Sequence, residues 1–219
     1  MKKLFSLLLC VSLCLCLLNV HAEKPVTAVK DNIYLTLVNK QNKLPDDWLM
    51  HVDLITTKNV VGEENIVESH ALIAFEGLRT CLLYEEGVQI ELDSTYRSLE
   101  EQQEIWDYWG ETYGQEYCEK YLSPVGYSEH HTGLAIDIFI MTKDNVEIRD
   151  NDEMIADKAD FAKIHAHIAD FGFILRYPEG RDNTTGYAYE PWHLRYVGNP
   201  VIAHYIMDNN MTLEEYLQD

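Results

Sequence analysis

The feature that most constrains the fold is one acidic residue inside an apolar strand. Residues 134–141 read Leu-Ala-Ile-Asp-Ile-Phe-Ile-Met, and this β-branched and aromatic run is typical of a buried strand. A carboxylate buried there alone would be costly, so Asp137 needs a cation or several hydrogen-bond donors. Gly133 and Ala135 are small enough to let the backbone pass close to a metal ion. Considered alone, Asp137 could simply cap a turn; in combination with the histidines and Glu190 described below, it predicts a metal site built on a sheet.

Short helices and strands alternate around this strand. Apolar residues at helical spacing predict helices at 66–86 and 155–170, and Ser98-Leu99-Glu100-Glu101 is a capping box that begins another helix. We expect that helix to carry Ile105, Trp106 and Trp109 into the core. Further strands are expected at 33–38, 88–92, 173–177 and 193–197, and further helices near 116–122 and in two C-terminal segments, the second capped by Thr212.

This order predicts an α+β fold, in which helices pack on a small, mostly antiparallel sheet that carries the metal site. The linkers are short, and 219 residues suit a single domain. We divide the chain into residues 1–22, an N-terminal arm at 23–65 that packs on the catalytic domain, and that domain at 66–219.

Residues 1–22 have the pattern of a signal peptide. Lys2 and Lys3 precede an apolar run from Leu4 to Val20, and Ala22 is a small residue where signal peptidase cuts. Cleavage after Ala22 predicts a secreted or extracytoplasmic protein. The alternative is an uncleaved membrane anchor, although the run is a little shorter than the ~20 residues that span a bilayer.

The formal net charge of −20 limits the partners of the chain. Residues 1–22 hold two lysines and no acids, so their removal leaves a charge near −22. Such a chain is not expected to bind nucleic acid, whose phosphates need cations. Beyond the N-terminal segment we expect no membrane contact, and the oligomeric state is not readable from the sequence.

Cleavage would leave two cysteines, Cys81 and Cys118. Export permits a disulfide, but each cysteine falls in an expected helical stretch and the sequence does not place them within bonding distance. A disulfide and two free thiols both remain possible.

Two histidines and a carboxylate offer the ligand set of a catalytic zinc. His130 precedes Asp137 by seven positions, and Glu190-Pro191-Trp192-His193 adds a second imidazole. Catalytic zinc takes three such ligands and leaves a fourth position for water. Glu190 lies three residues before His193 with a proline between them, a spacing that can place a general base beside that water.

Arg97 is the candidate for anion binding. It ends an expected strand and directly precedes a helix N-terminus, where backbone N–H groups also favour negative charge. Its guanidinium could hold a peptide carboxylate through two hydrogen bonds. The competing interpretation is a surface arginine paired with one of the many acids.

These segments resemble the zinc D-alanyl-D-alanine carboxypeptidases of the VanY type, relatives of the VanX dipeptidases within the LAS metallopeptidases. The family pattern S-x-H, six residues, D, then E-P-W-H is matched from Ser128 to His193, and Tyr96-Arg97-Ser98 with Glu101-Gln102 is similar to an upstream family element. The resemblance covers roughly residues 32–205. Thr95 and His131 depart from the residues common in the family, and we do not expect His131 to be a ligand.

The resemblance implies a role for each matched residue. His130, Asp137 and His193 would bind one zinc ion per chain, and Glu190 would be the catalytic base. Arg97 would hold the substrate carboxylate, with Ser128 and Gln102 also at the substrate.

The implied activity is removal of the C-terminal D-alanine from peptidoglycan stem peptides. Two enzyme alternatives are an L,D-carboxypeptidase acting on tetrapeptide stems and a dipeptidase, which the signal peptide disfavours because the free dipeptide is cytosolic. A third alternative is a zinc-containing binding domain without activity, as in the Hedgehog-type fold. The presence of Glu190 and Arg97 beside the three ligands favours the enzyme.

Overall fold

The computed structural model describes residues 24–25 and 32–218, apart from the side chains of residues 120 and 121. The predicted signal segment, residues 1–22, lies outside the described residues. None of the described helices is both long and apolar enough to cross a membrane.

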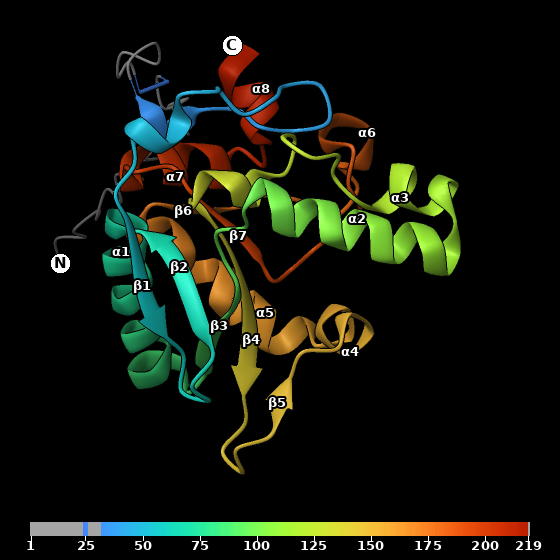
Figure 1. Ribbon diagram of the computed structural model, residues 1–219. Helices are drawn as coiled ribbons and strands as arrows, with labels where there is room; N and C mark the ends of the chain where they lie inside the picture. The colour runs from blue at the N-terminus through green and yellow to red at the C-terminus, as the bar shows by residue number, and fades with distance from the viewer. Residues whose placement is uncertain (1–23, 26–31, 219) are drawn as a thin grey trace, which may run out of the picture.

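A small antiparallel sheet forms the centre of the molecule (Figure 1). Its strands are hydrogen-bonded in the order β3 (Gln89–Ser94), β4 (Ala135–Met141), β7 (His193–Tyr196) and β6 (Phe173–Leu175), and β5 (Glu147–Ile148) pairs with β4. Every ladder is antiparallel. The expected α+β fold with a mostly antiparallel sheet is therefore confirmed, and the predicted apolar strand is β4.

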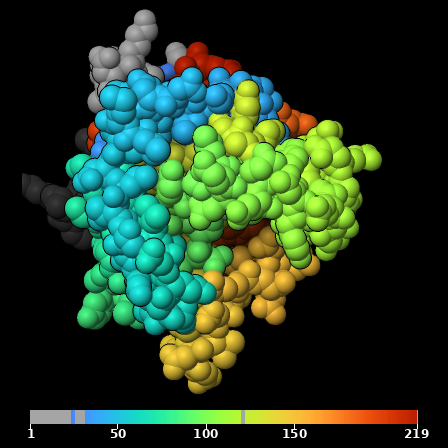
Figure 2. Space-filling model, viewed as in Figure 1, coloured from blue at the N-terminus to red at the C-terminus, as the bar shows by residue number. Residues whose placement is uncertain are grey.

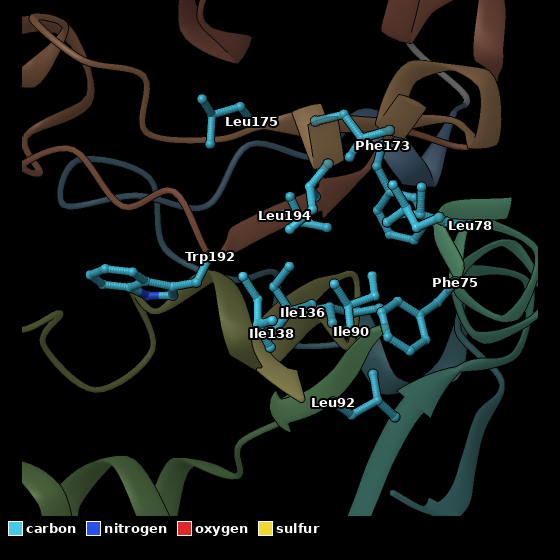
Figure 3. Packing of buried hydrophobic residues seen from close by; sticks show 14 of the residues in the cluster. Phe75, Leu78, Ile90, Leu92, Ile136, Ile138, Phe173, Leu175, Trp192 and Leu194 are labelled. Carbon is cyan, nitrogen blue, oxygen red and sulfur yellow. The ribbon is translucent and has the colours of Figure 1, made fainter. Parts of the chain in front are cut away.

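Helices α1 (Ser69–Cys81) and α5 (Lys158–His167) cover one face of this sheet (Figure 1). Alternate residues of β4, such as Ile136 and Ile138, enter the core on that face because successive strand residues point to opposite sides. Phe75 of α1 packs there against Ile90 of β3, as Figure 3 shows. The residue between the two isoleucines, Asp137, is thereby directed to the other face.

Helix α2 (Leu99–Tyr113) begins at the predicted capping box, but its aromatic residues are not in the core. Ser98 caps the helix with its side chain, and Gln102 is the buried residue of α2. The helix pairs with α3 (Gln115–Tyr121) instead of lying flat on the sheet. The expectation of core positions for Ile105, Trp106 and Trp109 was wrong: all three are half-buried, and Trp109 stacks on the ring of Tyr113 at 5.1 Å.

The N-terminal part differs from the prediction in two places. The expected strand at 33–38 is a 3₁₀ helix at Ile33–Leu35, because the Asn32 side chain accepts a hydrogen bond from the amide of Tyr34 and starts a turn. The expected helix at 66–86 begins later, at Ser69, because the Glu68 carboxylate caps its N-terminus. Residues 66–68 belong instead to a hairpin of β1 (Leu54–Lys58) and β2 (Glu64–Glu68), which lies across the division we placed at 65/66.

The remaining helices are short and connect or flank the strands. The expected helix at 155–170 is divided by Asp157, whose side chain caps α5. Thr212 caps the last helix as predicted, accepting a hydrogen bond from the amide of Glu215. These helices are α4 (Asn151–Ala156), α6 (Asp182–Thr185), α7 (Pro200–Asp208) and α8 (Leu213–Gln218).

Both cysteines in the described chain are free thiols. Cys118 is buried, whereas Cys81 is half-buried. No disulfide therefore contributes to the described fold.

Candidate metal and catalytic site

Three neighbouring strands place polar residues in one row across the sheet. Asp137 of β4 lies directly opposite His193 of β7 and opposite Ser94 of β3. Residues directly opposite one another point to the same face. Antiparallel register thus joins an aspartate and a histidine that are 56 residues apart.

His130 approaches this row from a 3₁₀ helix, Glu129–Thr132, that precedes β4. Its Nδ1 donates a hydrogen bond to the carbonyl oxygen of Thr95 at 2.7 Å, which leaves Nε2 directed to the row. Nε2 of His130 lies 3.2 Å from Oδ2 of Asp137, and Nδ1 of His193 lies 2.9 Å from Oδ1. The predicted ligands His130, Asp137 and His193 are therefore brought together.

The cluster fits a zinc ion in its chemistry and geometry. One ligand atom from each of the three residues lies within 4.8 Å of the other two. Two imidazoles and one carboxylate form a ligand set that zinc takes in hydrolases. Oδ1 of Asp137 is buried without a hydrogen-bond partner among the described residues, because its contact with His193 lacks hydrogen-bond geometry. A metal ion would satisfy this oxygen.

The carboxylates around the cluster also favour a positive charge at this position. Burial by itself would lower the pKa of His193, but Asp137 and Glu129 outweigh burial and raise that pKa to about 10. Burial would raise the pKa of Asp137, yet the two histidines hold it well below its usual range. The anionic surroundings of His193 thus favour positive charge at this point, as a proton or as a metal ion.

Glu190 lies beside the cluster at the start of a turn. The carbonyl oxygen of Glu190 accepts a hydrogen bond from the amide of His193, so that Glu190-Pro191-Trp192-His193 forms a turn leading into β7. Oε2 of Glu190 lies 3.8 Å from Nδ1 of His193. Burial, reinforced by the charges of Asp137 and Glu129, raises the pKa of Glu190 to about 7. A carboxylate of this pKa can both accept and release a proton near neutral pH.

Arg97 differs from the other arginines of the described chain in its partners. Arg79, Arg149, Arg176, Arg181 and Arg195 each form an ion pair with at least one carboxylate. Arg97 forms none among the described residues; its guanidinium donates to Oε1 of Gln102 and to Oγ of Ser94, both at 3.0 Å. These neutral acceptors position the guanidinium and leave its charge available to an anion.

Ser128 and Gln102, the other expected substrate-binding residues, are both almost fully buried beside the cluster. Gln102 uses both ends of its amide within the protein, because Nε2 donates to the carbonyl oxygen of Ser123 at 2.8 Å. Gln102 therefore contributes to the site through its hydrogen bond with Arg97 more directly than through contact with a substrate. His131, which we did not expect to be a ligand, donates from Nδ1 to the carbonyl oxygen of Arg97 at 2.7 Å.

A cavity of 540 Å³ connects these residues. Arg97, Gln102, Ser128, His130, Asp137, Glu190 and His193 all line it. Figure 2 shows the surface hollowed between the green helix α2 and the orange segment around α4, and side chains of both helices line the cavity. A second hollow, of 690 Å³, shares Arg97 but contains none of the three clustered ligands, so the chemistry belongs to the smaller one.

The sequence analysis missed the residues behind the cluster. Glu129, Arg176 and Arg195 are almost completely buried, and each arginine forms an ion pair with Glu129. Arg176 and Arg195 are charged residues in segments that are otherwise mostly apolar, the same signal that identified Asp137, whereas Glu129 lies in a polar segment and carries no such signal. Applying that argument to Phe173–Tyr177 and His193–Val197 would have predicted two buried arginines and an acid to pair with them.

The chain is similar to peptidases of known family. The model of the VanY family, described as D-alanyl-D-alanine carboxypeptidase, matches residues 64–199. The Bacillus subtilis protein YodJ is 35% identical over 187 residues, which cover 84% of this chain and 67% of YodJ.

Two solved structures share the fold over most of this chain. The L,D-carboxypeptidase LdcB has a TM-score of 0.69 and 32% identity, covering 84% of this chain and 86% of LdcB. The D,D-pentapeptidase VanY of a VanB-type resistance cassette, solved with Zn(II), has a TM-score of 0.66 and 30% identity, covering 84% of this chain and 99% of the other.

Proposed function

Because the chain belongs to the VanY family of D-alanyl-D-alanine carboxypeptidases, we propose that it is a zinc carboxypeptidase that removes the terminal D-alanine from peptidoglycan stem peptides. The observation that carries the proposal is the composition of one cavity. It joins a zinc-ligand set, a carboxylate whose pKa is near 7, and an arginine without a carboxylate partner among the described residues.

We assign His130, Asp137 and His193 to one zinc ion per chain. Bound zinc supplies a Lewis acid that polarises the carbonyl of the scissile bond. Glu190 lies at the cavity side of this cluster. It takes a proton from the attacking water and returns a proton to the departing amine, the two tasks of a general base and acid.

Arg97 restricts the reaction to the end of a peptide. A chain end differs from an internal peptide bond in its free carboxylate, and among the described residues the guanidinium of Arg97 lines the cavity without a carboxylate partner. Gln102 and Ser94 hold the guanidinium in place, while Ser128 lines the same cavity.

Mass spectrometry of defined stem peptides tests the reaction. We expect zinc-loaded enzyme to convert a pentapeptide stem into the tetrapeptide and to leave the tetrapeptide intact. The same pentapeptide with an amidated C-terminus should be cleaved far more slowly. Equal cleavage of the acid and the amide would instead indicate an endopeptidase, and no cleavage of any stem would indicate a binding domain.

The alternative is an L,D-carboxypeptidase acting on tetrapeptide stems, and the similarity to LdcB supports it. Zinc, Glu190 and Arg97 would serve both reactions, because each removes a terminal D-alanine that carries a free carboxylate. The two differ in the stereochemistry of the residue on the other side of the bond. Conversion of the tetrapeptide to the tripeptide in the same assay would establish this alternative.

We also propose that the enzyme acts outside the cytoplasm after loss of residues 1–22. The support is the sequence pattern of that segment, with two lysines, an apolar run and Ala22. N-terminal sequencing of exported protein should begin at Glu23. A sequence beginning at Met1 would indicate a membrane anchor.

A further inference from the structure

On the Nε2 side of His193, opposite the nitrogen that faces Asp137, lies a buried group of four charged residues. Glu129, Arg176, Arg195 and Glu214 have side chains that are at most 6% exposed. Oε1 of Glu129 accepts from Arg176 at 2.8 Å and from Arg195 at 2.6 Å. Arg176 also donates twice to Glu214, at 2.6 and 2.8 Å. Two carboxylates and two guanidinium groups balance in charge, which is the condition for burying them together.

One oxygen of this group is directed at a metal ligand. Oε2 of Glu129 lies 3.2 Å from Nε2 of His193, whereas Nδ1 of His193 faces Asp137 at 2.9 Å. Only one nitrogen of a neutral imidazole carries the proton, and a carboxylate can only accept. With Asp137 serving as a ligand of the same metal ion, Glu129 is the carboxylate left to accept the proton of neutral His193 on Nε2, and the lone pair of Nδ1 then faces the ligand cluster.

We infer that Glu129 is a positioning residue that selects the nitrogen with which His193 binds zinc. The inference rests on the proposed zinc site and concerns a residue that does not touch the substrate. A carboxylate behind a metal-bound histidine fixes the tautomer and orientation of the ring and raises its basicity. Arg176 and Arg195 in turn hold Oε1, so that Oε2 alone is left for His193.

The same group connects the site to both ends of the described chain. Arg195 donates to the carbonyl oxygens of Tyr34 and Thr36 at 3.0 and 2.8 Å. Glu214 of α8 accepts from the side chain of Asn39 at 3.0 Å. The N-terminal arm and the last helix therefore contact the charge group that holds Glu129.

Glu129→Gln tests the inference because an amide cannot satisfy all three donors. If its oxygen stays with the arginines, its NH₂ group faces Nε2 of His193 and drives the proton to Nδ1, the nitrogen needed by zinc. We expect the dissociation constant for zinc, measured by competition with a chromophoric chelator, to rise about 10- to 100-fold.

Glu214→Gln is the matched control, since it weakens the same charge group without contacting His193. It should alter zinc affinity less than about threefold, on the order of 0.6 kcal/mol.

Equal zinc affinity in wild type and Glu129→Gln would overturn the inference, and so would an equal loss in both variants. If Glu129→Gln does not fold, nitrogen-15 NMR of zinc-loaded wild type decides the question. His193 should carry its proton on Nε2 and His130 on Nδ1, whereas zinc on Nε2 of His193 would contradict the inference. Absence of zinc from wild type would refute the proposed function itself, a separate outcome.

Discussion

The charged groups on the two sides of the His193 ring differ in whether they have partners within the protein. On the Nε2 side, which we call the interior side, Glu129 pairs with two arginines and every charge of the group has a partner within the protein. On the cavity side, Oδ1 of Asp137 has no hydrogen-bond partner and Arg97 has no carboxylate partner among the described residues. Buried charges are costly unless they are paired. The unsatisfied oxygen of Asp137 and the guanidinium of Arg97 therefore mark where a metal ion and a substrate belong, and the paired charges support the site.

This contrast predicts that substitutions on the cavity side remove ligand binding or turnover and leave the fold intact. Substitutions on the interior side should first lower stability or metal affinity. The first substitution changes His193, which borders both sides. The later substitutions each change one side.

The largest effect is expected for His193→Ala. Metal analysis should find close to one zinc per chain in purified wild type and little in the variant, because two ligands alone hold zinc poorly. Circular dichroism controls for the fold, since His193 is 3% exposed and also contacts Glu129. Full zinc retention in a folded variant would remove His193 from the ligand set.

The second largest effect is expected for Glu190→Ala, which should reduce kcat ~10²–10⁴-fold, the usual contribution of a positioned general base. Zinc content and melting temperature should stay close to wild type. The Glu190 side chain is 27% exposed, and its ion-pair contact among the described residues is the 3.8 Å approach to His193. Steady-state kinetics on a pentapeptide stem measures the change. A loss of less than about tenfold would mean that another group carries the proton.

Arg97→Ala should lower kcat/KM for the free-acid pentapeptide at least ~10-fold. Charge-assisted hydrogen bonds are worth ~1.5–3 kcal/mol, and two are expected to the carboxylate. Arg97→Lys is the control that keeps the charge and loses the planar fork, so an intermediate rate is expected. The variant and wild type should cleave the amidated peptide at similar, low rates. A selective loss on the amide would contradict the assignment.

Glu214→Gln should have the smallest effect on catalysis and act on stability. Burial would raise the pKa of Glu214, but Arg176 outweighs it and lowers that pKa. A lowered pKa means that the ionised form stabilises the fold above the unfolded value of ~4.3, and that this stabilisation is lost as the pH falls through the folded pKa. We expect the variant to be less stable by about 1–3 kcal/mol at pH 7.

Thermal melts at several pH values check the sign of this effect. The difference between wild type and Glu214→Gln should be constant from about pH 6 to 7 and should shrink below about pH 4. A difference that grows in acid would mean that the carboxylate is not stabilised in its ionised form.

Part of the fold could be predicted because its signals are local. The capping box at Ser98 and the alternating residues of β3 depend on neighbours within a few positions, and both elements formed as expected. The start of α1 was misplaced because Glu68 is an unusual cap. The burial of Ile105, Trp106 and Trp109 in α2 was predicted wrongly. Apolar residues occur alike in a helix that packs on the sheet and in a helix that pairs with α3.

By itself, the sequence determined which residue types the site contains, and so which residues are candidates to bind zinc, move a proton or hold an anion. Asp137 in an apolar strand, and the motif from Glu190 to His193, are local statements about residue type and spacing. Only the tertiary structure decided which charges are neutralised within the protein. The pairing of Glu129 with Arg176 and Arg195 spans 47 and 66 residues, and the freedom of Arg97 follows from where every carboxylate of the described chain lies. Electrostatic partners depend on distance in space, and strand register sets that distance.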